Sequence, residues 1–404
     1  MSPGRVRGPA PHRFAWLAGL AVACGSGSPL QPPPPPPPPA APVLVKEIPI
    51  PPAYGVHDSF VRDGIAFVCA WNTGLIIYDV GNGIRGGSPA HPIEISRIVP
   101  SDDGVAGGPA VHNAWWFHNP NTGERRYVFL GQEGPAAVPS ESTGDIHVID
   151  VADLAQPREV AFYHMNVSPQ AGSHNFWMDE PAQILYAAYY NGGIVALDVS
   201  GTLSGDLAAR EIARIKPSAT PWTWGVQLVG GSLYAVDLLT GLYQLRLSGH
   251  SFSVVSGGGN VLDRYSSDLF VTGSYAYTGT WGLTPRNGAV GNAVKIWHLG
   301  PTGAPSLVDS IITDGIASVS DVKGSADGKL LVFTTEAGPK AGLYVYDLAN
   351  PARPRLVASV LATPGFHTVK VADIAGKRYL FAARNPGMPP TPALVIYDVT
   401  GLLP

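Results

Sequence analysis

The stretch Gly342-Leu343-Tyr344-Val345-Tyr346-Asp347-Leu348 predicts the fold, because the chain repeats it at a regular distance. Each copy is an apolar, strand-like run that closes on an aspartate and an aliphatic residue. Five complete copies occupy 74–80, 145–151, 193–199, 342–348 and 393–399, and two degenerate copies occupy 241–247 and 294–299. The aspartate position falls at 79, 150, 198, 246, 298, 347 and 398, with Arg246 and His298 replacing the aspartate in the degenerate copies. Spacings of 48 to 52 residues, with a single one of 71, therefore divide the chain into seven units.

A period near 50 residues with several short strands per unit is typical of a β-propeller. One small sheet cannot bury both of its faces, so such sheets stack on their neighbours around an axis. The apolar run 43–48 precedes the first unit, while little chain follows Asp398. We therefore predict an all-β, seven-bladed β-propeller over residues 43–404, closed by 43–48 as the outer strand of the seventh blade. The other blades take their outer strands from stretches after the aspartate, such as 93–98 and 355–360.

The phrase 342–347, followed by Pro351 and Pro354, resembles the LVIVD repeat of bacterial surface-associated propellers. The resemblance covers nearly all of the chain after residue 43. It implies an exported propeller, and it names no substrate.

Composition agrees with many short strands joined by turns. Charged residues make up 14% of the 404 positions, and Gly 48 and Pro 40 interrupt almost every decade, which excludes helical bundles and coiled coils. An apolar content of 45% excludes global disorder. The formal net charge is −4 without a basic tract, so we expect no nucleic-acid partner.

The N-terminal residues 1–24 are typical of a bacterial lipoprotein signal peptide. Arg5, Arg7 and Arg13 precede an apolar stretch, 14–23, that is too short to span a bilayer. Ala21-Val22-Ala23-Cys24 resembles a lipobox, with Ala21 where Leu is usual, so Cys24 is the predicted lipidation site and plain signal cleavage is the alternative. Gly25 after the cysteine favours the outer membrane. The predicted location is thus the cell envelope, with a lipid anchor as the membrane contact.

Residues 25–42 form the predicted tether. Gly and Ser residues are followed by eight prolines, Pro32–Pro39, which favour a semi-rigid polyproline II rod. A spacer between anchor and domain is the preferred interpretation, and a ligand for proline-binding modules is the alternative. If Cys24 is lipidated, Cys69 is the remaining cysteine, and its apolar surroundings predict a buried thiol.

Histidine recurs at one register of the repeat, just before or at the first strand of a unit. Four units carry it, at His57, His112, His174 and His367, and the other three carry Trp224-Gly225, Ser267-Asp268 and Ser320-Asp321. The first strand of a blade lies nearest the axis, and the four units are consecutive around the ring. We therefore expect the four histidines on one arc of one mouth of the channel.

Antiparallel pairing brings the end of the second strand to the same mouth. These strand ends carry further polar and aromatic side chains, among them Trp71, Glu133, Asp237, Trp281, Glu336 and Arg384. Imidazole and carboxylate ligands suit a divalent transition metal, and aromatics with a few polar groups suit an organic ligand. The candidate metal ligands are His57, His112, His174, His367, Glu133 and Glu336, and the candidate ligand-binding residues are Trp71, Trp224, Asp237, Trp281 and Arg384.

A structural interpretation competes with this one, because histidines before an inner strand often hydrogen-bond within or between blades. The sequence therefore favours a non-catalytic, lipid-tethered propeller that binds a protein, glycan or small molecule through one face. The alternative is a metal-dependent hydrolase or oxidase with the histidines at the channel mouth. Convergence of the four histidines within reach of one metal ion, with hydrogen-bond acceptors behind them, would favour the second function. Histidines that each bond within their own blade would favour the first. The aspartates of the repeat, such as Asp79 and Asp347, are predicted to cap turns.

Overall fold

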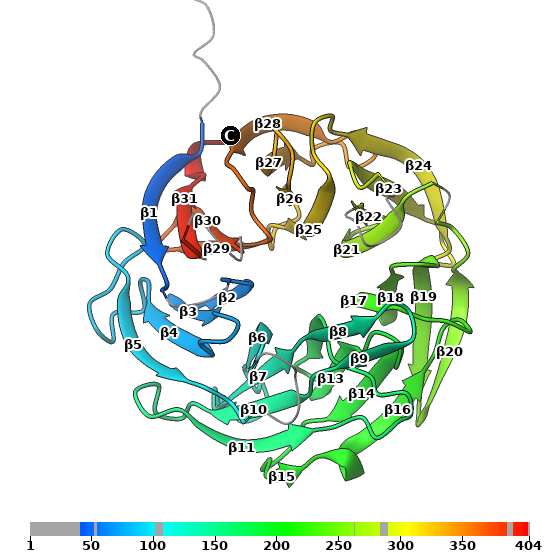
Figure 1. Cartoon of the computed structure of the whole chain (residues 1–404), viewed down its shortest axis with the longest axis horizontal. Coiled ribbons are helices and arrows are strands. Elements are labelled where there is room, and N and C mark those ends of the chain that lie inside the picture. The colour runs from blue at the N-terminus through cyan, green and yellow to red at the C-terminus, as the bar shows by residue number, and fades with distance from the viewer. Residues whose placement is uncertain are drawn as a thin grey trace, which may run out of the picture. The chain divides into compact units, whose positions relative to one another are not determined.

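Seven antiparallel sheets stand around a central axis, as Figure 1 shows. In the computed structural model, residues 41–51, 55–101, 108–261, 263–282, 290–385 and 391–402 are described. Each blade has four main strands, numbered from the axis outward along the chain. The predicted all-β, seven-bladed propeller is confirmed.

Blades 1 to 3 fill the first half of the chain. Blade 1 contains β2 (Asp58–Arg62), β3 (Ile65–Cys69), β4 (Leu75–Asp79) and β5 (Ile93–Ile98). Blade 2 contains β6 (Val111–Phe117), β7 (Tyr127–Gln132), β10 (Ile146–Asp150) and β11 (Arg158–Tyr163), with the short β15 (Gly205–Asp206) added in parallel to β11. Blade 3 contains β12 (Phe176–Asp179), β13 (Ile184–Ala188), β14 (Ile194–Asp198) and β16 (Glu211–Ile215), with the 3-10 helix η1 (Ala208–Arg210) before β16.

Blades 4 to 7 complete the ring. Blade 4 contains β17 (Thr223–Val229), β18 (Ser232–Asp237), β19 (Gly241–Ser248) and β20 (Ser251–Gly257). Blade 5 contains β21 (Tyr265–Thr272), β22 (Tyr275–Trp281), β23 (Ala293–Leu299) and β24 (Pro305–Ile312). Blade 6 contains β25 (Ser318–Gly324), β26 (Leu330–Glu336), β27 (Gly342–Asp347) and β28 (Arg355–Leu361). Blade 7 contains β29 (Thr368–Ile374), β30 (Lys377–Arg384), β31 (Ala393–Asp398) and β1 (Val43–Pro49), and η2 (Thr400–Leu402) follows β31.

The N-terminal strand closes the ring. β1 pairs antiparallel with β31, from Val43 opposite Asp398 to Pro49 opposite Ala393. The first and last strands of the propeller thus share one sheet, which confirms the predicted closure. Outer strands β5 and β28 also match the stretches predicted for them.

Seven buried apolar clusters, one between each pair of neighbouring blades, hold the described part of the ring together. The cluster between blades 2 and 3, for example, packs Phe129 of β7 against Leu185 of β13. The middle strands are almost entirely apolar because both of their faces lie against another blade. The free Cys69 thiol is fully buried in the cluster of blades 1 and 2, as predicted.

The repeat aspartates cap the turns that follow the third strand of blades 1, 2, 3, 6 and 7. Oδ1 accepts the backbone N–H two residues later at Asp150, Asp198, Asp347 and Asp398, at 2.8–3.0 Å. Such turns hold the chain as it crosses to the outer strand. The predicted capping role is confirmed.

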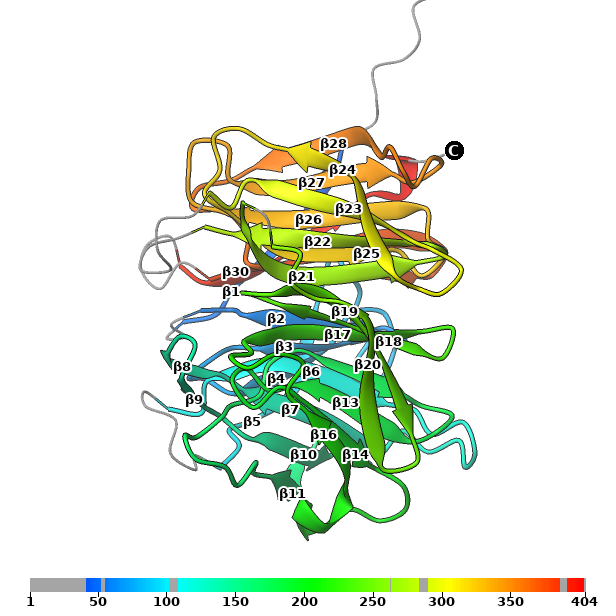
Figure 2. The same ribbon diagram turned by 90° about the vertical axis from the view of Figure 1, so that its right-hand side faces the viewer.

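The long second unit contains an extra hairpin. β8 (Gly134–Ala137) and β9 (Glu141–Thr143) pair with each other, and Figures 1 and 2 show them on one face of the ring, in front of blade 3. Asn191 of blade 3 anchors them, since its amide donates to the Ser140 carbonyl at 3.2 Å and accepts from the Ser142 hydroxyl at 2.6 Å. The insertion responsible for the spacing of 71 residues thus begins directly after Glu133.

No helix in the described ranges is long and apolar enough to cross a membrane. The predicted signal peptide, lipidation site Cys24 and most of the tether lie in residues 1–40, outside the described part of the chain. These assignments therefore stay predictions.

Candidate metal centre

The four histidines occupy equivalent places in consecutive blades. The backbone N–H groups of His57, His174 and His367 each donate to the carbonyl at the end of the second strand of their own blade, at 2.8 Å. His112 lies in β6, where the register of the strand pair shifts between Val111 and Asn113. In three of the four blades this shared backbone bond places the histidine at the same end of the inner strand.

The imidazole rings contact one another in blade order. Ring centroids are 4.1 Å apart for His367 and His57, 4.2 Å for His57 and His112, and 4.1 Å for His112 and His174. The structure therefore brings all four histidines onto one arc. His57, His112 and His174 are buried.

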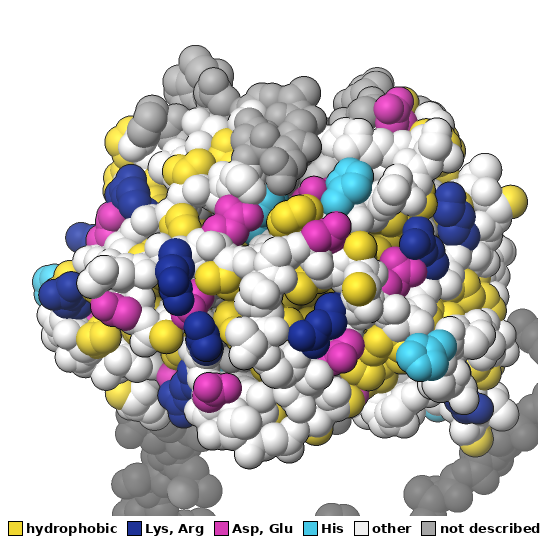
Figure 3. Space-filling view, turned by 90° about the horizontal axis from the view of Figure 1, so that it is seen from below, with side chains coloured by type: hydrophobic (Ala, Val, Ile, Leu, Met, Phe, Trp, Pro, Cys, Tyr) yellow, Lys and Arg dark blue, Asp and Glu magenta, His cyan; other side chains and the backbone are white. Residues whose placement is uncertain are grey.

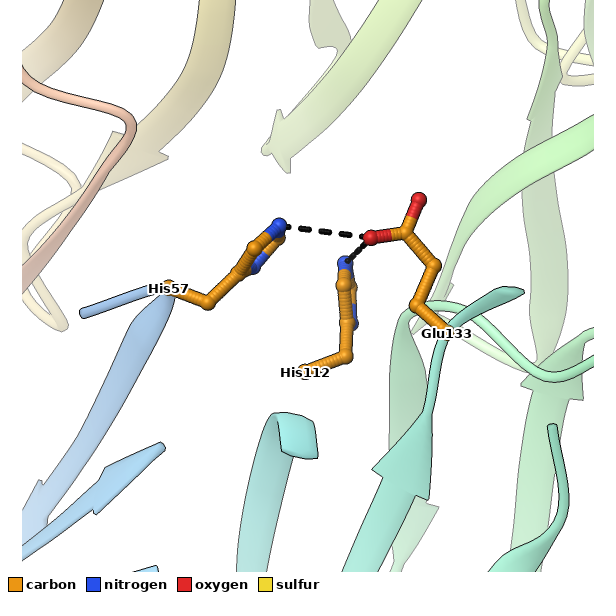
Figure 4. A group of neighbouring side chains, drawn as sticks. All are labelled: His57, His112 and Glu133. Atoms are coloured by element: carbon orange, nitrogen blue, oxygen red, sulfur yellow. Dashed lines mark ion pairs between the residues drawn. The ribbon is translucent and has the colours of Figure 1, made fainter. Parts of the chain in front are cut away.

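Glu133 lies at the centre of this arc (Figure 4). Its Oε2 is 3.3 Å from Nε2 of His57 and 3.8 Å from Nε2 of His112, while its Oε1 is 4.0 Å from Nε2 of His174. The Tyr190 hydroxyl donates to Oε1. One buried carboxylate thus faces three imidazoles from blades 1, 2 and 3.

Burial and mutual contact decide the charges of these groups. Burial lowers the pKa of His57 well below its ordinary value, and the neighbouring His367 and His112 add to the effect. Burial lowers the pKa values of His112 and His174 as well. Burial acts to raise the pKa of Glu133, but the attraction of His112 and His57 outweighs it and holds the pKa well below the ordinary range. Burial therefore disfavours the charged form of the three imidazoles, while the imidazoles favour the ionised form of the carboxylate.

His174 shows which ring atom carries its hydrogen. Its Nδ1 contacts the backbone carbonyl of Trp224, which can only accept, so Nδ1 donates and Nε2 holds a lone pair in the neutral ring. That lone pair lies on the side of the Glu133 carboxylate, 4.0 Å away. Two acceptors facing each other in a buried place favour a cation between them.

The spacing fits a metal ion. Two ligand atoms that each lie about 2.1 Å from one tetrahedral metal are about 3.4 Å apart. The observed separations from Glu133 Oε2, 3.3 Å for His57 and 3.8 Å for His112, are close to this value. Ligand atoms of His57, His112 and Glu133 all lie within 4.8 Å of one another. This donor set suits a divalent transition metal.

The three histidines around Glu133 differ in the hydrogen bonds of their Nδ1 atoms. The Trp224 carbonyl orients His174, as a ligating histidine requires. Nδ1 of His57 and Nδ1 of His112 have no hydrogen-bond partner among the described residues. The remaining predicted ligands form a separate pair, because Nδ1 of His367 lies 2.8 Å from Glu336 Oε1. Burial acts to lower the pKa of His367, but Glu336 outweighs it and raises the pKa.

Aromatic rings enclose the imidazoles. Trp71 stacks on His57 with centroids 4.8 Å apart, and Trp224 lies 4.6 Å from His174. Trp281 approaches His367 at 6.4 Å. Trp71 has a φ of 51° and Tyr190, at the equivalent strand end of blade 3, a φ of 40°. This left-handed conformation is costly without glycine, and Ala337 adopts it as well, with a φ of 55°, after the second strand of blade 6.

Two predicted ligand-binding residues do not join the cluster. Asp237 ends β18, but both of its carboxylate oxygens accept hydrogen bonds from its own blade, at Trp222, Leu239 and Thr240. Arg384 turns outward and contacts Glu47 of β1 and the Thr391 carbonyl. Their side chains therefore serve the turn and the ring closure, which corrects the expectation that they line the mouth beside the histidines.

The sequence places Tyr190 at the same mouth but does not select it as a site residue, although it donates to Glu133. Tyr190 lies two residues after the second strand of blade 3, as Trp71 lies two residues after that of blade 1. The hydroxyl contact itself depends on how blades 2 and 3 pack, which no local pattern contains.

Comparisons with known proteins support the fold. No family model matches the chain, so the likeness to LVIVD repeats stays a resemblance. No curated protein matches it either. Among solved structures, the WD40 β-propeller domain of Doa1 has a TM-score of 0.57 and 7% identity, covering 89% of this chain and 97% of that one. A chain of the mitotic checkpoint complex has a TM-score of 0.61 and 12% identity, covering 96% of this chain and 99% of that one. At such identities the likeness establishes the β-propeller fold alone.

Proposed function

We propose that the chain is a metal-binding propeller in which His57, His112 and Glu133 hold one divalent transition metal, with His174 beside them. The observation that carries the proposal is the approach of two imidazole Nε2 atoms to one carboxylate oxygen, at 3.3 and 3.8 Å, among buried side chains. A divalent cation would occupy the space between these ligand atoms.

The ligand set defines the class of chemistry. A metal held by imidazoles and one carboxylate supplies a Lewis acid when bound, or a redox centre if the metal is iron, manganese or copper. The chain's own groups would keep this centre dry and oriented. Trp71 and Trp224 cover the imidazoles, and the Tyr190 hydroxyl holds Glu133. Such a centre is compatible with a metal-dependent hydrolase or oxidase.

Elemental analysis of residues 41–404, purified without a histidine tag, tests this proposal. We expect about one transition metal per chain after reconstitution, and its loss in the Glu133→Gln and His57→Ala variants. His298→Ala is the matched control, since His298 lies on the third strand of blade 5 against Tyr275, away from the centre. Absence of metal in the reconstituted wild type, or equal metal in Glu133→Gln, would exclude the metal centre.

A second candidate function is a lipid-tethered binding platform in the cell envelope. Its support is the predicted signal peptide, Cys24 and poly-proline tether, together with a fold commonly used for protein interaction. One structurally similar chain belongs to the mitotic checkpoint complex, a protein assembly. Figure 3 shows one side of the ring, where basic and acidic side chains alternate and apolar ones lie scattered. A binding surface for a protein or glycan would therefore lie on one of the two ring faces.

Detergent phase partition of the full chain tests the tether. We expect the wild-type chain in the membrane fraction, enriched in the outer membrane, and the Cys24→Ser variant in the aqueous phase. Cross-linking on intact cells would then identify a partner held by the propeller. Equal partition of the two chains would exclude the lipid anchor.

A further inference from the structure

A cavity of about 380 Å³ runs along the axis beside the histidines. Residues from the inner strands of all seven blades line it: β2, β6, β12, β17, β21, β25 and β29. Figure 1 labels all of these except β12 and shows them nearest the centre. Its lining begins one residue after the histidines, at Asp58, Asn113 and Asn175. The cavity is therefore distinct from the candidate metal centre, because none of the four histidines lines it, and the two lie next to each other along the inner strands.

One wall of the cavity is aromatic. Phe60, Trp115 and Trp177 come from blades 1, 2 and 3, and successive ring centroids are 5.3 Å apart. Trp115 and Trp177 are only half-buried, unlike the tryptophans of the core. Phe270 of blade 5 also lines the cavity. Such a wall suits a flat apolar group of a ligand, which can stack on the aromatic rings or pack edge-to-face against them.

A lysine without a close carboxylate faces this wall. The ammonium Nζ of Lys370, on β29, lies 4.7 Å from the centroid of the Phe60 ring. Among the described residues no carboxylate oxygen lies within 4.0 Å of this Nζ. Lys323 of the neighbouring blade differs, because its Nζ contacts both Asp268 and, at 2.7 Å, Asp321. Of the two lysines that line the cavity, Lys370 is thus the one whose ammonium group could form an ion pair with an anionic ligand.

The electrostatics of the cavity favour an anion. Burial lowers the pKa of Lys370 to about 8 against the attraction of Asp58, so its ammonium is poorly compensated. Burial also raises the pKa of Asp268 to about 7 despite Lys323. This acid therefore carries less negative charge at neutral pH than an exposed aspartate would. An anionic group beside Lys370 would gain a charge-assisted hydrogen bond in a desolvated place.

We propose that the channel binds an aromatic monocarboxylate, whose carboxylate pairs with Lys370 and whose ring lies against Phe60, Trp115 and Trp177. This ligand site adds a substrate class to the proposed metal centre, yet its binding does not require the metal.

Three probes of one shape and different charge test the proposal: naphthalene-2-carboxylate, 2-naphthylmethanol and 2-naphthylmethylammonium. Calorimetric titration of residues 41–404 measures each affinity. We expect the carboxylate to bind at least tenfold more tightly than the other two. In Lys370→Met this preference falls to twofold or less. Lys377→Met is the matched control, because Lys377 of the same blade pairs with Asp398 at an exposed position, and it retains the wild-type preference.

Two further variants keep the test decisive. Lys370→Arg retains the positive charge and should retain the preference, even if Lys370→Met folds poorly. Trp177→Leu should weaken all three probes alike, because it shortens the aromatic wall. Binding of the ammonium or alcohol as tightly as the carboxylate, an unchanged preference in Lys370→Met, or no binding of any probe would overturn the proposal. Glu133→Gln separates this site from the metal centre, since it should lose metal and still prefer the carboxylate.

Discussion

Nε2 of His57 lies 3.3 Å from Oε2 of Glu133, although the two residues belong to different blades. His57 precedes the inner strand of blade 1, and Glu133 follows the second strand of blade 2. Antiparallel pairing within a blade and side-by-side packing of blades bring these two kinds of strand end to one face of the ring. The pair therefore depends on the packing of blade 1 against blade 2, which brings its imidazole and carboxylate together.

Metal binding should stabilise the folded chain and depend on Glu133. A ligand that binds only the folded state, at a hundredfold excess over its dissociation constant, adds about 2.7 kcal/mol to the free energy of unfolding. We expect Zn²⁺ or Mn²⁺ to raise the midpoint of thermal unfolding by several degrees in the wild type, measured by calorimetry, and a chelator to reverse the rise.

Glu336→Gln is the control for this prediction. Glu336 bonds to His367 and not to the three central ligands, so the variant should keep the metal-dependent rise. Glu133→Gln should lose it. An equal rise in both variants would mean that the stabilising ion binds elsewhere.

The repeat pattern predicts the fold because each copy marks the same strand. The apolar run is the third strand of a blade, and its aspartate caps the following turn, so counting copies counts blades. The histidine register predicts a shared arc for the same reason, since equivalent positions in a ring lie at equivalent distances from its axis.

Side-chain partners that arise between distant segments could not be predicted in this way. Arg384 ends an inner hairpin, as the mouth residues do, yet Glu47 attracts it outward from a strand 337 residues earlier in the chain. That acid is adjacent only once β1 has closed the ring. Lys370 and Phe60 likewise meet across the boundary between blades 7 and 1, so the repeat contains no signal for the cavity they line.

Asp79 should be the most stabilising of the repeat aspartates. Its carboxylate accepts five backbone N–H groups, from Gly81, Asn82, Gly83, Arg85 and Gly87. Hydrogen bonds to a charged acceptor contribute about 1.5–3 kcal/mol each, and they are not additive. We expect Asp79→Ala to lower the free energy of urea unfolding by about 3 kcal/mol. The Asp347 carboxylate accepts one backbone N–H and one hydrogen bond from the exposed Arg355 side chain. Asp347→Ala should therefore lower the free energy of unfolding by about 1 kcal/mol. Equal losses of unfolding free energy in the two variants would contradict the larger stabilising role of Asp79.

The contribution of Asp79 should also depend on pH. Burial acts to raise its pKa, but the backbone donations from Arg85, Gly81 and their neighbours outweigh burial and lower the pKa to about 2, from an ordinary value of 3.8. A depressed pKa in the folded state stabilises the protein above the unfolded-state value, and this stabilisation is lost as the pH falls through about 2. The difference in unfolding free energy between wild type and Asp79→Ala should therefore be full at pH 6 and smaller at pH 3. If the difference grew as the pH fell, the pKa of Asp79 would be raised in the folded state and not lowered, which would contradict the prediction.

Closure of the ring by β1 should account for a measurable part of the stability. A chain that begins at residue 50 loses Val45 and Ile48, which pack against the cluster of blades 7 and 1, and exposes the edge of β31. We expect its free energy of urea unfolding to fall by about 3 kcal/mol or more, and light scattering to reveal association through the open edge. A chain that begins at residue 41 keeps β1 and should match the full-length protein in both measurements. If the two shortened chains were equally stable and monomeric, the ring would not depend on its N-terminal strand.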